Sequence, residues 1–367
     1  MTKLLLHDFH DGRGAHFATV NEAEVVDHYQ DTLAEYTALQ ETAGVVDLSF
    51  RSRVCVTGAD RVRFLHGQVT NDITGLVTGS GCYAAITTTK GKMEADLNIY
   101  RLAEELLLDF EPGLTKNVSD RLEKYIVADD VQVVDIGPLY GLLSVQGPES
   151  ASVAIAAGLA QEFPQKQLAF VKVQECAAGE VYLMNQPRLG TSGFDLFMPI
   201  GQIGDYMDKL VASAKAIGGR LCGWRAVEMA RIEGGIPRFG VDMDESNFPQ
   251  ECGIESRAVS YTKGCYIGQE ILNRIHTLGH VNRELTGLRL ADGLKDLPVK
   301  GTRLFHAGKE AGYTTSALAS PKLGANVALG YVRKELNQIG KEVMLRCEEE
   351  ESRAQVVPVP FLKKPAA

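Results

Sequence analysis

The order of predicted strands and helices repeats along the chain, and this repeat constrains the fold most. One run begins with a strand, the turn Gly-Ala-Asp at residues 58–60 and a short helix; the next begins with a strand, the turn Gly-Pro-Glu at residues 147–149 and a helix. Each run is approximately strand, helix, two strands, helix and strand, which is typical of the split βαβ arrangement of ferredoxin-like folds. We therefore predict an α+β fold with duplicated ferredoxin-like units at about residues 45–137 and 138–260.

The pattern changes towards the C-terminus, where short predicted strands are separated by Gly, Pro or Asn. Spacing of this kind is typical of a small closed β-barrel. We therefore place a boundary near Asn282, between a region of residues 1–282 and a barrel domain of residues 283–367. The barrel strands are expected at residues 285–290, 302–306, 311–318, 328–332, 342–346 and 355–359.

A helix is also predicted ahead of the first unit. Asn21 and Glu24 resemble a helix start in which side chains satisfy unpaired backbone N–H groups. Apolar residues then recur at roughly helical spacing between residues 25 and 39, and Gly44 follows. This pattern predicts a helix that ends before Gly44.

Composition indicates a folded protein of a reducing compartment. The 367 residues are 45% hydrophobic and 23% charged, which suits a globular chain of two or three packed regions. A net charge of −9 without a basic cluster argues against a nucleic-acid-binding protein. The seven cysteines include no Cys-x-x-Cys pair, so no disulfide framework is expected. No secretory or membrane-length apolar segment occurs, and we expect a cytoplasmic protein without a membrane partner.

The most unusual stretch is KGCYIGQE at residues 263–270. Two glycines flank a thiol and an aromatic ring, so the backbone can turn tightly and expose Cys265. In an extended segment Lys263 and Cys265 point to the same side, and a nearby ammonium favours the reactive thiolate. The alternative is a buried cysteine in a turn, because a free cysteine behaves as a small hydrophobic side chain.

A metal site is a further alternative for Cys265. Cys252, Cys265, His276 and His280 lie close in the sequence. Zinc fingers place two to four residues between paired cysteines, whereas residues 253–264 intervene here. We therefore predict no metal site, and we expect the two histidines at the surface.

Three charged residues are candidates for ligand binding. Asp96 lies in a predicted strand, on a face shared with Glu94 and Asn98, where it either accepts from ligand N–H groups or lies at a solvated edge. Asp195 follows a glycine-rich loop and is placed either to meet a ligand or to cap a loop. Arg231 lies on a predicted amphipathic helix, where it either clamps a carboxylate or pairs with Glu228.

Other familiar sites are missing from the sequence. No phosphate-binding glycine loop ends in Lys-Ser or Lys-Thr, and neither a dinucleotide fingerprint nor a Gly-x-Ser-x-Gly motif occurs. The sequence therefore lacks the motifs that would indicate a kinase, a Rossmann-type dinucleotide-binding protein or a hydrolase.

Together these stretches resemble a known family. Residues 263–270 resemble the signature K-G-C-Y-x-G-Q-E of YgfZ-type proteins. Residues 43–49 and 70–72 resemble the opening of the wider superfamily that includes the T protein of the glycine cleavage system, an aminomethyltransferase. Residues 230–235 resemble its L-R-L-E-A-G stretch, and residues 317–332 resemble its C-terminal barrel. The resemblance spans nearly the whole chain.

The resemblance implies a folate-binding channel through a ring of three subdomains, with tetrahydrofolate as the cofactor. A carboxylate at the position of Asp195 would hold the pterin, because the pterin edge offers adjacent N–H donors. Arg231 and Asp96 match positions that line the same site, and we add Tyr83 to the expected folate-binding residues.

YgfZ-type proteins are linked to iron–sulfur cluster assembly or repair. The resemblance therefore implies iron–sulfur proteins or their assembly machinery as partners. Cys265 would be the functional thiol, and Lys263 and Asp96 would be further catalytic residues. A third hypothesis, a role in tRNA modification, depends only on analogy within the superfamily.

Departures from the T protein decide between the two main hypotheses. The T protein has two adjacent acids where this chain has Ala95-Asp96, and its G-Y-T-G-E stretch is represented only by residues 190–193. Its D-F-I-G stretch is replaced by residues 265–268. These changes favour a folate-dependent accessory factor for iron–sulfur proteins. The alternative is a folate-dependent aminomethyltransferase or another one-carbon transferase.

Overall fold

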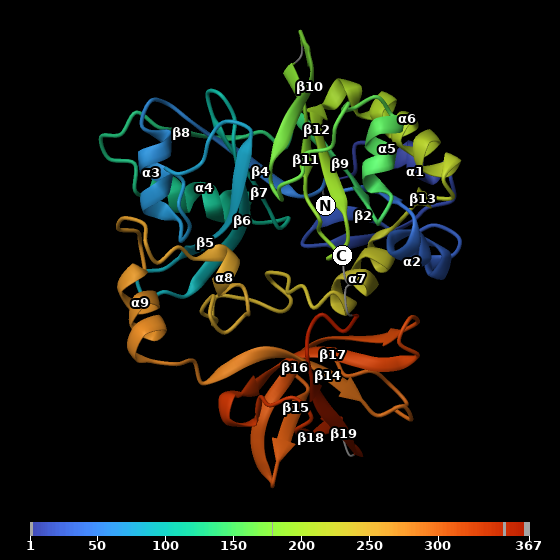
Figure 1. The fold of residues 1–367 in the computed structure, drawn as a ribbon, viewed down its shortest axis with the longest axis vertical. Helices are drawn as coiled ribbons and strands as arrows, with labels where there is room; N and C mark the ends of the chain where they lie inside the picture. Colours follow the sequence, from blue (N-terminus) through green and yellow to red (C-terminus); the bar gives the residue numbers. More distant parts are fainter. Residues whose placement is uncertain (1–2, 178, 348–349, 363–367) are drawn as a thin grey trace. The chain divides into compact units, whose positions relative to one another are not determined.

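The computed structural model describes residues 3–177, 179–347 and 350–362 (Figure 1). The chain forms two compact units, which are described separately. The first compact unit comprises Met1–Ile86, Ala95–Glu228 and Thr262–Tyr266, and the second comprises Thr87–Glu94, Met229–Tyr261 and Ile267–Ala367.

The first repeat forms a five-stranded sheet in the order β5-β6-β7-β4-β8. Its chain order is one strand, a helix, three strands, a helix and a final strand. The elements are β4 (Ser52–Thr57), α3 (Arg61–Gln68), β5 (Ser80–Thr87), β6 (Met93–Arg101), β7 (Leu106–Phe110), α4 (Thr115–Glu123) and β8 (Gln132–Asp135).

The second repeat has the same chain order, and its sheet has the order β10-β11-β12-β9-β3-β13. One strand from earlier in the chain, β3 (Gly44–Asp47), is inserted antiparallel to β9 and parallel to β13. The remaining elements are β9 (Tyr140–Gln146), α5 (Ser150–Ala156), β10 (Phe170–Cys176), β11 (Gly179–Asn185), β12 (Gly193–Pro199), η1 (Ile200–Gln202), α6 (Ile203–Ala216) and β13 (Arg220–Leu221).

The matching order confirms the predicted α+β fold with a duplicated architecture. Each repeat has three strands between its helices, one more than the split βαβ scheme. The two predicted turns occupy equivalent places, after β4 and β9. Gly58 and Gly147 both adopt positive φ, at 99° and 130°, and a Cβ on either would collide with a backbone carbonyl, of Asp130 or Thr42. Glycine is therefore required at both turns.

The helices of each repeat pack on one face of its sheet. In Figure 1, α5 and α6 lie together beside β9 and β12, and their apolar side chains share a core with Leu143, Phe194 and Leu196. A second core, which includes Leu97 and Leu108, lies between the five-stranded sheet and its helices α3 and α4. The opposite face of the five-stranded sheet is left for polar side chains.

The predicted helix over residues 21–39 is wrong. A hairpin of β1 (His16–Val20) and β2 (Ala23–His28) occupies the first part, and α2 (Thr32–Glu41) begins only after Asp31, whose side chain accepts from Ala34 N. Asn21 and Glu22 form the two-residue turn, with φ of 46° and 66°. Two positive φ values in succession are typical of the turns that join tight hairpins. The short helix α1 (His7–Asp11) precedes the hairpin.

The second compact unit contains a closed barrel in the strand order β14-β17-β16-β15-β18-β19, which confirms the predicted β-barrel. Its core includes Leu288, Leu304 and Val332. Within the described residues, no helix combines the length and apolarity needed to cross a membrane. The elements from α7 onwards are α7 (Trp224–Glu233), α8 (Glu255–Ala258), α9 (Gln269–Leu278), β14 (Arg283–Leu290), β15 (Arg303–His306), β16 (Lys309–Ser320), β17 (Ala325–Arg333), η2 (Lys334–Leu336), β18 (Glu342–Cys347) and β19 (Glu350–Val357).

Candidate functional site

Polar side chains gather on the face of the five-stranded sheet that its helices do not cover. Tyr83 on β5 donates its hydroxyl to Asp96 Oδ2 on β6, at 2.7 Å. Asn98 lies two residues further along β6, on the same face and about 7 Å away by strand geometry. Its side-chain amide donates to Oδ2 of Asp109 on β7, at 3.1 Å. The predicted residues Tyr83 and Asp96 are therefore direct partners on one polar face.

Asp109 belongs to a buried ion cluster, defined here as Arg51, Asp109, Glu111, Arg188 and Asp195. Arg51 Nε lies 2.8 Å from Asp109 Oδ1, and Arg51 Nη1 lies 2.6 Å from Glu111 Oε1. Arg188 Nη2 lies 2.7 Å from Asp109 Oδ2. The cluster links the polar face of the five-stranded sheet to β12 of the six-stranded sheet.

Asp195 is fully buried on β12, and its carboxylate is engaged by Arg188. Arg188 Nε lies 3.1 Å from Oδ1 and 3.0 Å from Oδ2. We expected Asp195 to meet a ligand directly, but the structure places Arg188 against it. A hydrogen bond also fixes the backbone of Arg188, whose N–H donates to Gln146 Oε1 at 2.9 Å. Sequence reasoning did not identify Arg188, which lies in an irregular segment without a motif.

The two buried carboxylates differ in acidity. Burial raises the pKa of Asp195 above its ordinary value, although Arg188 opposes this effect. Burial also acts on Asp109, but the guanidinium groups of Arg188 and Arg51 outweigh it and hold the pKa of Asp109 well below its usual range. The difference follows from the number of guanidinium groups, because Asp109 contacts two of them and Asp195 contacts one.

The buried ion cluster favours a ligand that donates hydrogen bonds. Its three carboxylates face two guanidinium groups, so acceptors exceed cations. Tyr100, on the same face of β6, is fully buried, and its hydroxyl has no hydrogen-bond partner within the described part of the chain. Burial and the charges of Asp195 and Asp109 raise the pKa of Tyr100 well above its ordinary value. Its hydroxyl is therefore neutral and able to donate or accept.

The predicted thiol stretch, residues 263–270, begins at Lys263, which anchors the loop that carries Cys265. Its Nζ donates to the carbonyl oxygens of His66, Val69 and Asn71, at 2.5, 2.7 and 2.8 Å. An ammonium has three donors, so these bonds occupy all of them. Burial lowers the pKa of Lys263 to about 8. The contacts give Lys263 a role in holding the loop against the end of α3, and its chemical role stays a prediction.

Cys265 is an exposed free thiol, so the alternative of a buried structural cysteine is wrong. The imidazole of His66 lies next to the loop, because a Cβ on Gly264 would be 3.5 Å from His66 Nε2. Burial and the nearby Lys263 lower the pKa of His66, which favours a neutral ring at neutral pH. Sequence reasoning missed His66, which is almost 200 positions away from Cys265.

Arg231 lies in the second compact unit and is buried there. Its Nη1 lies 2.7 Å from Asp242 Oδ2, and its Nη2 donates to Ser316 Oγ at 3.0 Å. Asp242 Oδ1 also accepts from Thr315 and Ser316, at 2.6 and 2.7 Å. Arg231 therefore connects α7 to β16, and its predicted contact with a ligand stays a prediction.

Two of the four residues considered for a metal site contact other side chains. Cys252 is buried, with its sulfur 3.2 Å from the Tyr331 hydroxyl. His276 Nδ1 lies 3.0 Å from Glu255 Oε1. In residues 3–177, 179–347 and 350–362, no three His, Cys, Asp or Glu side chains gather in a way that would hold a metal ion.

Comparisons with known proteins agree with this architecture. The chain matches the GCVT N-terminal domain over residues 6–263 and the glycine cleavage T-protein C-terminal barrel domain over residues 283–363. It is 30% identical over 338 residues to an aminomethyltransferase of Halalkalibacterium halodurans, which covers 90% of this chain and 89% of that protein. It is 28% identical over 371 residues to one of Shouchella clausii, covering 99% of each.

A solved structure has the same fold. The glycine cleavage system aminomethyltransferase T from Bartonella henselae superposes with a TM-score of 0.89, covers 98% of both chains and is 24% identical. The duplicated repeats and the closed barrel are thus shared across the full length of that protein. From its two domain matches and its near full-length relatives, the chain belongs to the glycine cleavage T-protein family.

Proposed function

We propose that this protein binds tetrahydrofolate and transfers a one-carbon unit to it as an aminomethyltransferase. The observation that carries the proposal is the Tyr83–Asp96 pair on the polar face, in a chain that aligns almost completely with aminomethyltransferases. The departures from the T-protein motifs favoured an accessory factor, but the near full-length relatives support the enzyme better.

Asp96 is the proposed acid–base residue. Reduced folate supplies nitrogen atoms that accept a methylene group while ammonia is released, and this step requires a group that removes protons from those nitrogens. Asp96 is half-buried, and Tyr83 orients one oxygen of its carboxylate. A positioned carboxylate typically accelerates such a proton transfer by about 10²- to 10⁴-fold.

The buried ion cluster is the proposed pterin-recognition region. A pterin edge carries adjacent N–H donors, and one carboxylate can accept two of them. Asp195 has the acceptor chemistry for this pairing, and the Tyr100 hydroxyl lacks a partner within the described residues. Because Arg188 engages Asp195 in the structure, pterin binding at Asp195 requires Arg188 to give up at least part of that pairing.

Turnover is tested with purified protein, tetrahydrofolate and an aminomethyl donor, by measuring ammonia and methylene-tetrahydrofolate. We expect Asp96→Asn to lower the rate by about 10²-fold or more and to leave the circular dichroism spectrum unchanged. Asp120→Asn, at an exposed position of α4, is the matched control. Absence of turnover by the wild type, or full activity of Asp96→Asn, would remove the proposal.

Folate binding is tested separately by calorimetric titration of tetrahydrofolate into the wild type and Asp195→Asn. The amide keeps the size of the carboxylate but replaces one acceptor oxygen with a donor, so we expect affinity to fall about tenfold or more. An unchanged affinity in a folded Asp195→Asn variant would exclude Asp195 as the pterin-binding residue.

A second candidate function is a YgfZ-type accessory role for iron–sulfur proteins. The observation in its favour is Cys265, an exposed thiol in a loop that Lys263 anchors, within the sequence KGCYIGQE. In a strain that lacks the protein, Cys265→Ala is expected to leave iron–sulfur enzyme activity impaired while tetrahydrofolate affinity stays normal. Full restoration of that activity by Cys265→Ala would exclude a role for the thiol.

A further inference from the structure

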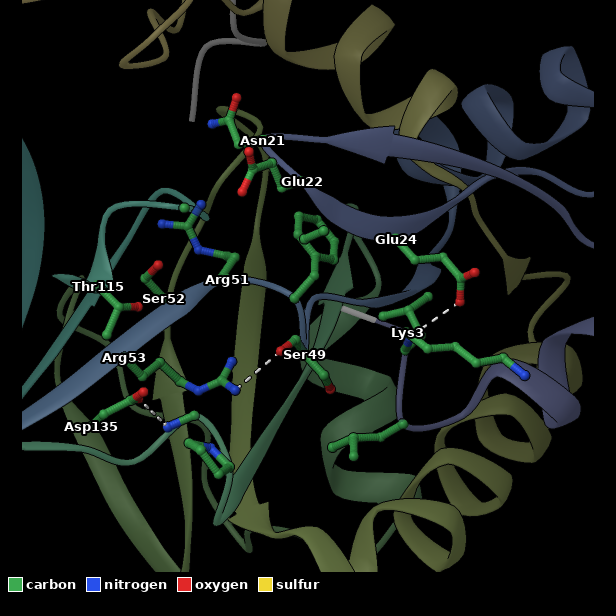
Figure 2. A pocket seen from close by; sticks show the side chains of 17 residues that line it. Lys3, Asn21, Glu22, Glu24, Ser49, Arg51, Ser52, Arg53, Thr115 and Asp135 are labelled. Carbon is green, nitrogen blue, oxygen red and sulfur yellow. Dashed lines mark hydrogen bonds between the residues drawn. The ribbon is translucent and has the colours of Figure 1, made fainter. Parts of the chain in front are cut away.

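A pocket of about 450 Å³ lies in the first compact unit, and Figure 2 shows its lining, which includes Arg51 of the buried ion cluster but neither Asp96 nor Asp195. Its wall is formed by the β1–β2 turn, the start of β4, the first residue of α4 and the segment after β8. The volume lies within the range of about 300–1,000 Å³ that is usual for small-molecule sites.

Arg53 carries an unpaired, buried cationic group in this wall. Its side chain is 1% exposed, and Nη2 donates to the carbonyl oxygens of Ser49 and Tyr140 at 3.1 and 2.8 Å. Nε and Nη1 have no hydrogen-bond partner in the described parts of the chain. Figure 2 shows the side chain extended along the pocket towards Ser49. Buried N–H groups of this kind are costly unless a partner accepts from them.

The neighbouring cations do not share this property. Arg51 also lines the pocket, but Asp109 and Glu111 engage its guanidinium. Lys3 is largely exposed and lies 3.6 Å from Asp8. Burial lowers the pKa of Arg53 to about 10, yet this value keeps the group cationic at neutral pH. An anion in the pocket would offset the cost of burying that charge.

The lining restricts the kind of anion. Exposed Asp135 and Glu22 also line the pocket, so a single negative charge is accommodated with less repulsion than a double one. Leu4, Phe50 and Pro138 provide apolar surface for an organic group. These features together indicate a compact molecule with one carboxylate and an apolar part.

We propose that this pocket binds a small organic monocarboxylate, with the Nε and Nη1 groups of Arg53 donating to its carboxylate. The proposal needs neither folate nor turnover, so it stands or fails independently of the aminomethyltransferase function. It adds a ligand site at the start of β4, whose lining includes neither Asp96 nor Asp195.

The test is calorimetric titration of the whole protein with benzoate and butyrate at constant ionic strength, with chloride and inorganic phosphate as anion controls. We expect saturable binding of one carboxylate with a dissociation constant of about 1 mM or tighter. Arg53→Gln is expected to weaken it at least about tenfold, because a charge-assisted contact is lost. Lys116→Ala, next to the pocket residue Thr115 but outside the pocket, is the matched control and should bind normally.

Arg53→Gln also removes donors from the Ser49 and Tyr140 carbonyls, so a second variant is needed if it fails to fold. Thr115→Phe places a ring in the pocket and leaves Arg53 and its carbonyl contacts intact. It should abolish carboxylate binding. The proposal is overturned if the wild type binds neither carboxylate, if chloride or phosphate binds equally well, or if a folded Arg53→Gln or Thr115→Phe variant binds like the wild type.

Discussion

Arg188 faces both carboxylate oxygens of Asp195 in the interior of the first compact unit, with Nε 3.1 Å from Oδ1 and 3.0 Å from Oδ2. The same guanidinium reaches Asp109, so one side chain joins the two sheets. Burying these charges is costly, and their mutual pairing offsets that cost. Loss of one partner therefore lowers the free energy of unfolding more than loss of a surface ion pair does.

Replacing Arg188 with Met is expected to lower the free energy of unfolding by about 3–5 kcal/mol, because Asp195 is then buried without a cationic partner. Urea denaturation measures the change. Lys116→Met serves as the control, since its pair with Asp120 is exposed and screened by solvent and should contribute little to stability. A loss in Arg188→Met no greater than that of the control would contradict the importance of the buried ion cluster.

Tyr100→Phe is expected to keep or raise stability, by up to about 1 kcal/mol, because it removes a buried hydroxyl that has no partner within the described residues. The same variant should weaken tetrahydrofolate binding if the hydroxyl contacts the ligand, since stability and function often conflict at binding sites. Thermal unfolding and calorimetric titration measure the two effects.

Tyr206→Phe is the matched control for Tyr100→Phe. Its hydroxyl donates to Gln174 Oε1 at 3.0 Å, so its removal should destabilise the protein by about 1 kcal/mol. A destabilisation of the same size in both variants would mean that the Tyr100 hydroxyl has a partner.

The contribution of Lys263 to stability should depend on pH. Burial lowers its pKa to about 8, whereas in the unfolded chain the value is about 10.4. Between these values the unfolded chain binds more protons than the folded chain, so stability from this residue rises with pH. Below about pH 8 both states are protonated, and the contribution is constant.

This dependence is measured as the difference in Tm between the wild type and Lys263→Met across a pH series. We expect the difference to shift in favour of the wild type as pH rises from about 8 to 10. Lys90→Met, at an exposed position, is the matched control. A constant difference for Lys263→Met over this range would contradict the burial of its ammonium.

Of the cysteines whose surroundings are described, Cys265 should be the first to react with a thiol reagent. It is exposed, whereas Cys55, Cys222 and Cys252 are buried. Burial also raises the pKa of Cys82 to about 12, which disfavours its thiolate. Brief alkylation followed by peptide mass mapping should place the label on the peptide that contains residue 265. Earlier labelling of Cys82 or Cys252 would refute the exposed loop.

The sequence was most informative where local patterns determine structure. The barrel strands are predictable because they are short and separated by Gly, Pro or Asn, and β14 to β18 follow the expected segments closely, whereas β19 begins earlier than expected. The duplicated order was predictable from the turns at Gly58 and Gly147, where a carbonyl approach excludes any side chain.

The N-terminal error has a local cause. Apolar residues from Val25 onwards fit helical spacing, but Val25 and Val26 favour strands. Asn21 tolerates the positive φ of a hairpin turn, and this was the available signal. Residues 23–28 follow the period of a strand, and Asp31 is the side chain that marks the start of the helix.

The candidate site was predictable only in part. Tyr83 and Asp96 lie on β5 and β6, which are neighbours in the sheet and successive in the sequence, so their contact follows from local geometry. Arg188 and Arg51 have no motif, and their partners are selected by the packing of two sheets. Arg51 meets Asp109 across 58 positions, and Arg188 meets it across 79. Contacts between residues so far apart in the sequence cannot be predicted without knowledge of the tertiary fold.

The insertion of β3 has a consequence for how the protein is made on the ribosome. Residues 44–47 are synthesised early, yet their neighbours in the sheet, β9 and β13, emerge about a hundred and about 175 residues later. Until β9 is synthesised, β3 has no partner strand, so the second sheet cannot form before then. A gene divided between the repeats would therefore separate the second sheet from one of its inner strands.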